Sequence, residues 1–126
     1  MAELSDYMEN KIIEVMRATT FTAAAAYVAL YTTDPTDADT GTEVTGGSYA
    51  RQLAGLTVAS GGASSNAADI TFPTATASWG TVTHVGLRDA VTAGNLYMHS
   101  ILDASKTVGI GDTFKINLGD LDVTVA

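Results

Sequence analysis

Apolar residues near the start of the chain recur at the spacing of an α-helix. The recurring positions are Met8, Ile12, Val15 and Met16, with Tyr7 and Ile13 at the margins. Ser5 stands directly before them and is a residue type that caps helix N-termini. The pattern therefore predicts one amphipathic helix over residues 5–17, ending near Arg17 or Ala18. A helix of this length is marginal in water, so we expect its apolar stripe to dock, either on the rest of the domain or on a partner chain.

Beyond Phe21 the apolar positions alternate with a period of two, which is typical of β-strands. Turn residues separate seven such runs, at 27–31, 48–58, 70–72, 82–87, 95–102, 114–118 and 121–125. The four alanines at 23–26 are compatible with strand or helix, and Gly61-Gly62 opens a loop. The sequence predicts a mainly β fold, an antiparallel β-sandwich of about seven short strands with one N-terminal helix.

Length and composition favour a single domain. The chain has 126 residues, of which 46% are hydrophobic, and this suits one modest core. We expect the helix within residues 1–20 and the β-sandwich within 21–126.

Charge and composition exclude several functional classes. Six Lys and Arg against fourteen Asp and Glu give a net charge of −8, which would repel a phosphate backbone, so no nucleic-acid partner is expected. No apolar run approaches the length of a membrane helix, and acidic residues stand where a signal peptide would carry positive charge. The absence of cysteine excludes disulfides, thiolate zinc sites and cysteine nucleophiles.

The segment Thr33–Gly47 is long for a hairpin connection, and such loops are often functional or partner-bound. It carries the one local concentration of possible calcium ligands, namely Asp34, Asp37, Asp39 and Glu43. Counted from Asp37, the glycine comes one residue early and Ser48 stands where a calcium loop has its bidentate glutamate. The pattern favours a solvated, turn-rich loop, and no metal site is predicted.

The remaining chemistry-bearing residues favour structural roles. His84 and His99 lie in apparent strands with neither a third metal ligand nor a sequence-adjacent carboxylate, so we interpret both as core or interface histidines. Trp79 is interpreted as a core residue, the alternative being an exposed aromatic that grips a sugar. Arg51 and Arg88 are expected to pair with carboxylates, within the domain or across a subunit boundary. No catalytic residue, cofactor site or phosphate loop is found, and no enzyme is predicted.

A family resemblance covers nearly the whole chain. The segments that carry it are 5–11, 27–31, 34–38, 41–44, 46–52, 70–75, 79–86 and 111–116. In these segments the chain resembles a family of short tailed-bacteriophage virion proteins, commonly labelled tail-fibre proteins. Small β-sandwich proteins of similar size also serve as capsid cement or decoration proteins. The resemblance implies a structural protein of the virion, made in the host bacterial cytoplasm, and it carries over no catalytic residue.

Two locations in the virion follow from this resemblance. We expect first a capsid cement or decoration protein that self-associates and bridges major capsid protein subunits, because a fibre usually gains length from repeats or a coiled coil and neither is present here. The alternative is a tail fibre or tail-tip protein with a host-surface or glycan-binding role. In both cases we expect a homo-oligomer, with three copies by analogy with virion surface proteins.

Overall fold

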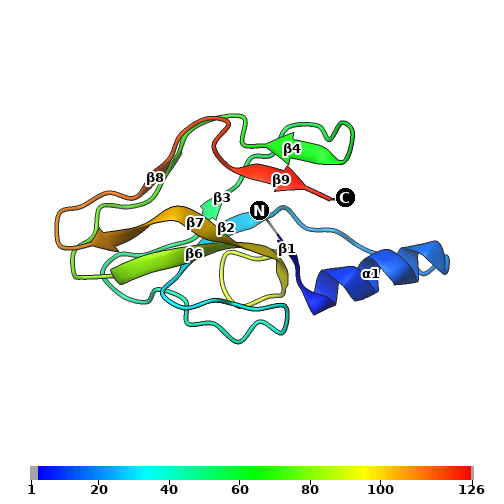
Figure 1. The fold of residues 1–126 in the computed structure, drawn as a ribbon, viewed down its shortest axis with the longest axis horizontal. Helices are drawn as coiled ribbons and strands as arrows, with labels where there is room; N and C mark the ends of the chain where they lie inside the picture. Colours follow the sequence, from blue (N-terminus) through cyan, green and yellow to red (C-terminus); the bar gives the residue numbers. More distant parts are fainter. Residues whose placement is uncertain (1–2, 126) are drawn as a thin grey trace.

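The computed structural model describes residues 3–125 and contains one helix and nine strands within them (Figure 1). Residues 1, 2 and 126, which the predicted segments 1–20 and 21–126 include, lie outside this range. The elements are β1 (Glu3–Leu4), α1 (Asp6–Met16), β2 (Tyr27–Tyr31), β3 (Gln52–Leu53), β4 (Ala63–Ser65), β5 (Ile70–Thr71), β6 (Gly80–Arg88), β7 (Leu96–Val108), β8 (Lys115–Ile116) and β9 (Asp122–Thr124). The prediction of a mainly β, antiparallel fold with one N-terminal helix is confirmed.

One five-stranded antiparallel sheet forms the body of the protein, in the order β1-β7-β6-β2-β3. Two short antiparallel ribbons, β4-β9 and β5-β8, lie over one face of it (Figure 1). Buried apolar side chains from both layers form one core. The predicted sandwich is therefore asymmetric, since a continuous sheet faces two separate ribbons.

The seven predicted strands are all present. β2 has its predicted bounds and the other six differ from theirs, and two strands were not predicted. β1 and β4 are short, and each forms a strand only through its hydrogen bonds to a partner strand. β1 pairs with Met98 and His99 of β7, and β4 pairs with β9. The run predicted at 48–58 contracts to β3, because Gly55 and the turn at Gly46 and Gly47 have the left-handed backbone that interrupts a strand. β7 extends to Val108, beyond the predicted 95–102, because its polar end pairs with the start of β6.

A large bulge interrupts the pairing of β6 with β7. From Val82 to His84, β6 advances two residues, while β7 advances five between the paired residues Ile101 and Lys106. The residues 102–105 therefore leave the regular ladder. Extra residues on one strand bend it and increase the local twist, so β7 follows a curved path across the sheet.

Four aromatic rings from segments that flank the strands pack together in the core. Phe72 is 1% exposed, and its ring lies 6.2 Å from that of Tyr49 and 5.6 Å from that of Phe114. Trp79, 4% exposed, packs edge-on against Tyr49 and donates its indole N–H to the Gly47 carbonyl at 2.9 Å. A Cβ at Gly47 would lie 2.8 Å from the indole nitrogen, so this position requires glycine.

Helix α1 has the predicted cap and extent. The Ser5 hydroxyl accepts the Met8 N–H at 3.1 Å and donates to the Leu96 carbonyl, so the same side chain caps the helix and fastens it to β7. The helix ends at Met16 with Arg17 as its C-cap, after which Ala18 has a left-handed backbone. None of the helix side chains is fully buried.

The aromatic cluster gives a first prediction. Phe72→Ala should lower the free energy of unfolding by about 3–5 kcal/mol, because it removes a buried ring and leaves a cavity between Tyr49 and Phe114. Val58→Ala is the control, since Val58 is 94% exposed and should change stability by less than about 0.5 kcal/mol. Urea denaturation measures both, and equal effects of the two substitutions would contradict the proposed packing.

Candidate functional site

The loop at 33–47 folds back on its own sheet, and its acidic side chains are paired there. Asp39 and Glu43 each bind an arginine, Asp37 binds a histidine, and Asp34 accepts the Thr36 N–H at 2.9 Å. Asp39 and Glu43 thus face the arginines while Asp37 faces the histidine, and the four carboxylates do not converge on one point.

Arg51 and Glu43 form a bidentate pair at the edge of the core. The guanidinium donates to both Glu43 oxygens, at 2.8 and 2.7 Å, and to the carbonyls of Ala90 and Ala93. The Tyr49 hydroxyl also donates to Glu43, at 2.6 Å. Burial opposes ionisation of Glu43, but the hydrogen bonds from Arg51 and Tyr49 outweigh it and hold the pKa of that carboxyl below its ordinary value.

Arg88 and Asp39 form a second bidentate pair beside the first. The two nitrogen–oxygen distances are 2.7 and 2.9 Å, and Arg88 also donates to the Tyr31 hydroxyl at 3.0 Å and to the Gly94 carbonyl. Burial raises the pKa of the Tyr31 hydroxyl. Both arginines therefore pair with carboxylates of the same chain. Their hydrogen bonds are directed to protein groups, so these arginines have a structural role.

The two histidines lie close to carboxylates, which the sequence analysis did not anticipate. His99 is 5% exposed, and its Nε2 is 2.8 Å from Asp37 Oδ1 and 3.9 Å from Glu3 Oε2. The Asp34 carboxylate lies 3.8 Å from Nδ1 of His99 and 3.9 Å from Nε2 of His84. His99 and Asp37 are 62 positions apart along the chain, so no local spacing could have revealed the cluster.

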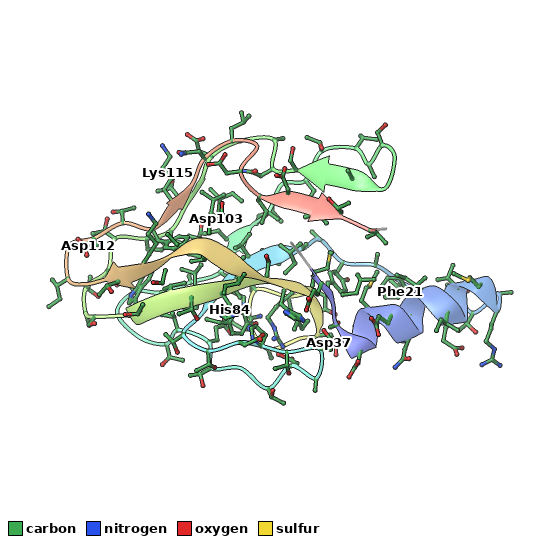
Figure 2. The ribbon with its side chains drawn as sticks, viewed as in Figure 1. Phe21, Asp37, His84, Asp103, Asp112 and Lys115 are labelled. Atoms are coloured by element: carbon green, nitrogen blue, oxygen red, sulfur yellow. The ribbon has the colours of Figure 1, made fainter. Side chains whose placement is uncertain are left out.

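A small hollow opens over this histidine–carboxylate cluster. It encloses about 230 Å³ and is lined by Glu3, Asp34, His84, His99, Ser100 and Ile101. Figure 2 shows Asp37 beside the first turn of α1 and His84 on the sheet. Glu3, Asp37 and His99 each offer a ligand atom, and these atoms all lie within 4.8 Å of one another. The cluster is the candidate site for a cation.

A larger groove of about 580 Å³ runs between the β6-β7 hairpin and the segment 114–124. Its apolar lining includes Val85, Met98, Leu102, Phe114, Leu121 and Val123. Charged residues also line it, among them Asp103 and Lys115, which Figure 2 labels. Between residues 3 and 125, every buried side-chain nitrogen or oxygen atom has a hydrogen-bond partner. Over the same range, no helix is long and apolar enough to cross a membrane.

The exposed-aromatic alternative for Trp79 does not fit the structure. The indole is buried, and its N–H is bonded to the backbone. Trp79 is therefore a core residue, as the sequence analysis interpreted it.

The buried ion pairs predict that the same substitution, arginine to methionine, lowers stability more at a buried position than at an exposed one. Arg88→Met should cost about 2–3 kcal/mol of folding free energy, below the 3–5 typical of a broken buried pair because Asp39 is partly exposed and can be rehydrated. Arg17→Met breaks the exposed Arg17–Glu14 pair and should cost less than about 1 kcal/mol. Urea unfolding of both variants tests this, and similar losses would mean that the buried pair contributes little.

Glu43 predicts a dependence of stability on pH. Its pKa in the folded protein lies below the ordinary value of 4.5, so its contribution is complete above pH 4.5 and is lost as the pH falls through the folded-state pKa. Glu43→Gln should be less stable than the wild type at neutral pH, and the difference should shrink as the pH is lowered below 4.5. A difference in urea midpoint that stays constant with pH would contradict this.

Comparison with protein families places the chain in one of them. A family model described as podophage GP4 fiber I protein gp80 matches residues 3–124, which is almost all of the chain. No curated protein matches the sequence. The match agrees with the expected resemblance to tailed-phage virion proteins, and it names a fibre. The chain therefore belongs to the podophage GP4 fiber I protein gp80 family, a family of phage tail-fibre proteins that are structural components of the virion.

Proposed function

We propose that this chain is a structural subunit of a podophage tail fibre and that copies of it associate through helix α1. The family match supports this fibre role, which was the alternative in the sequence analysis, over the capsid cement interpretation. The burial of Trp79 counts against a glycan-binding role for this side chain.

The observation that carries the proposal is the position of α1. Its first turn is fixed to the body: the Ser5 N–H donates to the Tyr97 carbonyl at 3.0 Å, and the Asp6 N–H donates to the Asp37 carbonyl at 2.9 Å. The Tyr7 ring also stacks on Tyr97. From this base the helix extends away from the sheet (Figure 1).

The apolar stripe of α1 is covered only near this base. Met8 and Ile12 are half-buried, whereas Val15 is 51% exposed and Met16 is 77% exposed. Isolated helices of this length are marginal, and most helix stability in proteins comes from packing of the apolar face. Association of α1 with other copies would bury the exposed half of the stripe.

Charges beside the stripe favour a parallel arrangement of identical helices. At 100° per residue, Lys11 flanks the stripe on one side and Glu9 on the other. In parallel bundles of identical helices, one flank of each helix faces the opposite flank of its neighbour. The flank that carries Lys11 in one copy would then lie along the flank that carries Glu9 in the next. We expect three copies, by analogy with virion surface proteins.

Light scattering coupled to gel filtration tests this association. The wild-type chain should be oligomeric at micromolar concentration, and Val15→Lys combined with Met16→Lys should make it monomeric, because the charges would be buried against another helix. The control is Val58→Lys, which adds a lysine at an exposed apolar position of the β3–β4 connection and should leave the mass unchanged.

A charge exchange tests the parallel arrangement. Glu9→Lys alone should weaken the oligomer, because both of the facing flanks would then carry lysine, and adding Lys11→Glu should restore it. A monomeric wild type would refute self-association through α1. An oligomer that survives all of these substitutions would place the interface elsewhere.

A further inference from the structure

The histidine–carboxylate cluster beneath α1 differs from the other carboxylates of the same loop. Asp39 and Glu43 are each neutralised by a buried arginine. The hollow over the cluster is lined by Glu3 and Asp34, and Asp37 adjoins it through His99, while the lining described for it contains neither lysine nor arginine. Three carboxylates thus meet two imidazoles with no permanent cation between them, which leaves the cluster with excess negative charge.

We propose that Glu3, Asp37 and His99 bind one divalent transition-metal ion, such as Zn²⁺. Their ligand atoms come from three separate segments, which are β1, the loop at 33–47 and β7. Ligands about 2 Å from a tetrahedral ion lie about 3.3 Å from each other. The distances from His99 Nε2 to Asp37 Oδ1 and Glu3 Oε2, 2.8 and 3.9 Å, lie on either side of this value.

The exposure of the two carboxylates suits capture of an ion. His99 is held in the sheet, whereas the side chains of Glu3 and Asp37 are 66% and 48% exposed, so an ion at Nε2 can reach both from solvent. A water molecule would complete four-coordination. An imidazole nitrogen with two carboxylates suits zinc and its neighbours, whereas calcium takes oxygen ligands alone and in larger number.

Asp34 occupies the place of a supporting carboxylate. An imidazole bound to metal through Nε2 carries its proton on Nδ1 and commonly donates it to a carboxylate. Asp34 Oδ1 lies 3.8 Å from Nδ1 of His99, and a shift on the order of 1 Å would bring it into hydrogen-bond range. His84 Nε2 lies 3.9 Å from the same Asp34 oxygen, so His84 adjoins Asp34.

Bound metal would fasten the base of α1. Glu3 precedes the helix by three residues, and the Asp37 backbone carbonyl accepts the Asp6 N–H. An ion held by both carboxylates and by His99 would therefore tie the helix base, the loop and the sheet together. This site lies within one chain and does not depend on self-association through α1.

Calorimetry with Zn²⁺ tests the site on the full chain. We expect one ion per chain and a rise in melting temperature, because a ligand that binds only the folded state stabilises it. Ca²⁺ should produce no rise. Glu3→Gln and Asp37→Asn should each weaken Zn²⁺ binding by more than about 100-fold, since loss of a supporting partner alone costs about 10- to 100-fold. Asp34→Asn should fall in that smaller range, and Asp103→Asn, an exposed aspartate on β7, is the control.

Nuclear magnetic resonance locates the ion directly, because the chain has only two histidines. Zn²⁺ should shift the Nε2 resonance of His99 strongly and leave the ring nitrogens of His84 nearly unchanged. Absence of binding at millimolar Zn²⁺ would overturn the proposal. So would affinity that is equal in the wild type, Glu3→Gln and Asp37→Asn, since the ion would then be bound elsewhere.

Discussion

Burial of two arginines at one end of the sheet constrains the rest of the structure. Arg51 and Arg88 are each less than a tenth exposed, and both donate to the Ala93 carbonyl, so two like charges lie close together. Such a pair is costly to remove from water unless each charge meets a carboxylate in good geometry. Glu43 and Asp39 supply those carboxylates, and both come from the loop at 33–47. The loop is therefore fixed to the sheet, because its two carboxylates neutralise the buried arginines.

The position of the helix follows from the position of this loop. Asp37 belongs to the same loop and precedes Asp39 by two residues. Its carbonyl accepts the Asp6 N–H, and its carboxylate contacts His99. The direction in which α1 leaves the body is thus set by contacts far along the chain. The proposed association through α1 would benefit from such a fixed direction, because a helix without one would lose more entropy on association.

Local sequence patterns predicted the helix and most of the strands, whereas the histidine–carboxylate cluster depends on contacts between residues far apart in sequence. The Ser5 cap and the stripe from Met8 to Met16 specified the helix, and the apolar run at 27–31 specified β2, because their neighbours in sequence carry the signal. β1 was missed because two residues have no period and become a strand only beside β7. The same holds for the cluster at His99 and for the partner of Arg88, since Asp39 lies 49 positions away.

The bulge in β7 has a consequence for copies held side by side. Within residues 3–125, β1 covers the outer edge of β7 only at Met98 and His99, and an uncovered strand edge invites pairing with any other chain. The displacement of residues 102–105 breaks the regular row of backbone donors and acceptors, and Asp103 and Lys106 add charge there. Neighbouring subunits in a fibre would then meet through side chains, and their sheets would not merge into one aggregating ladder.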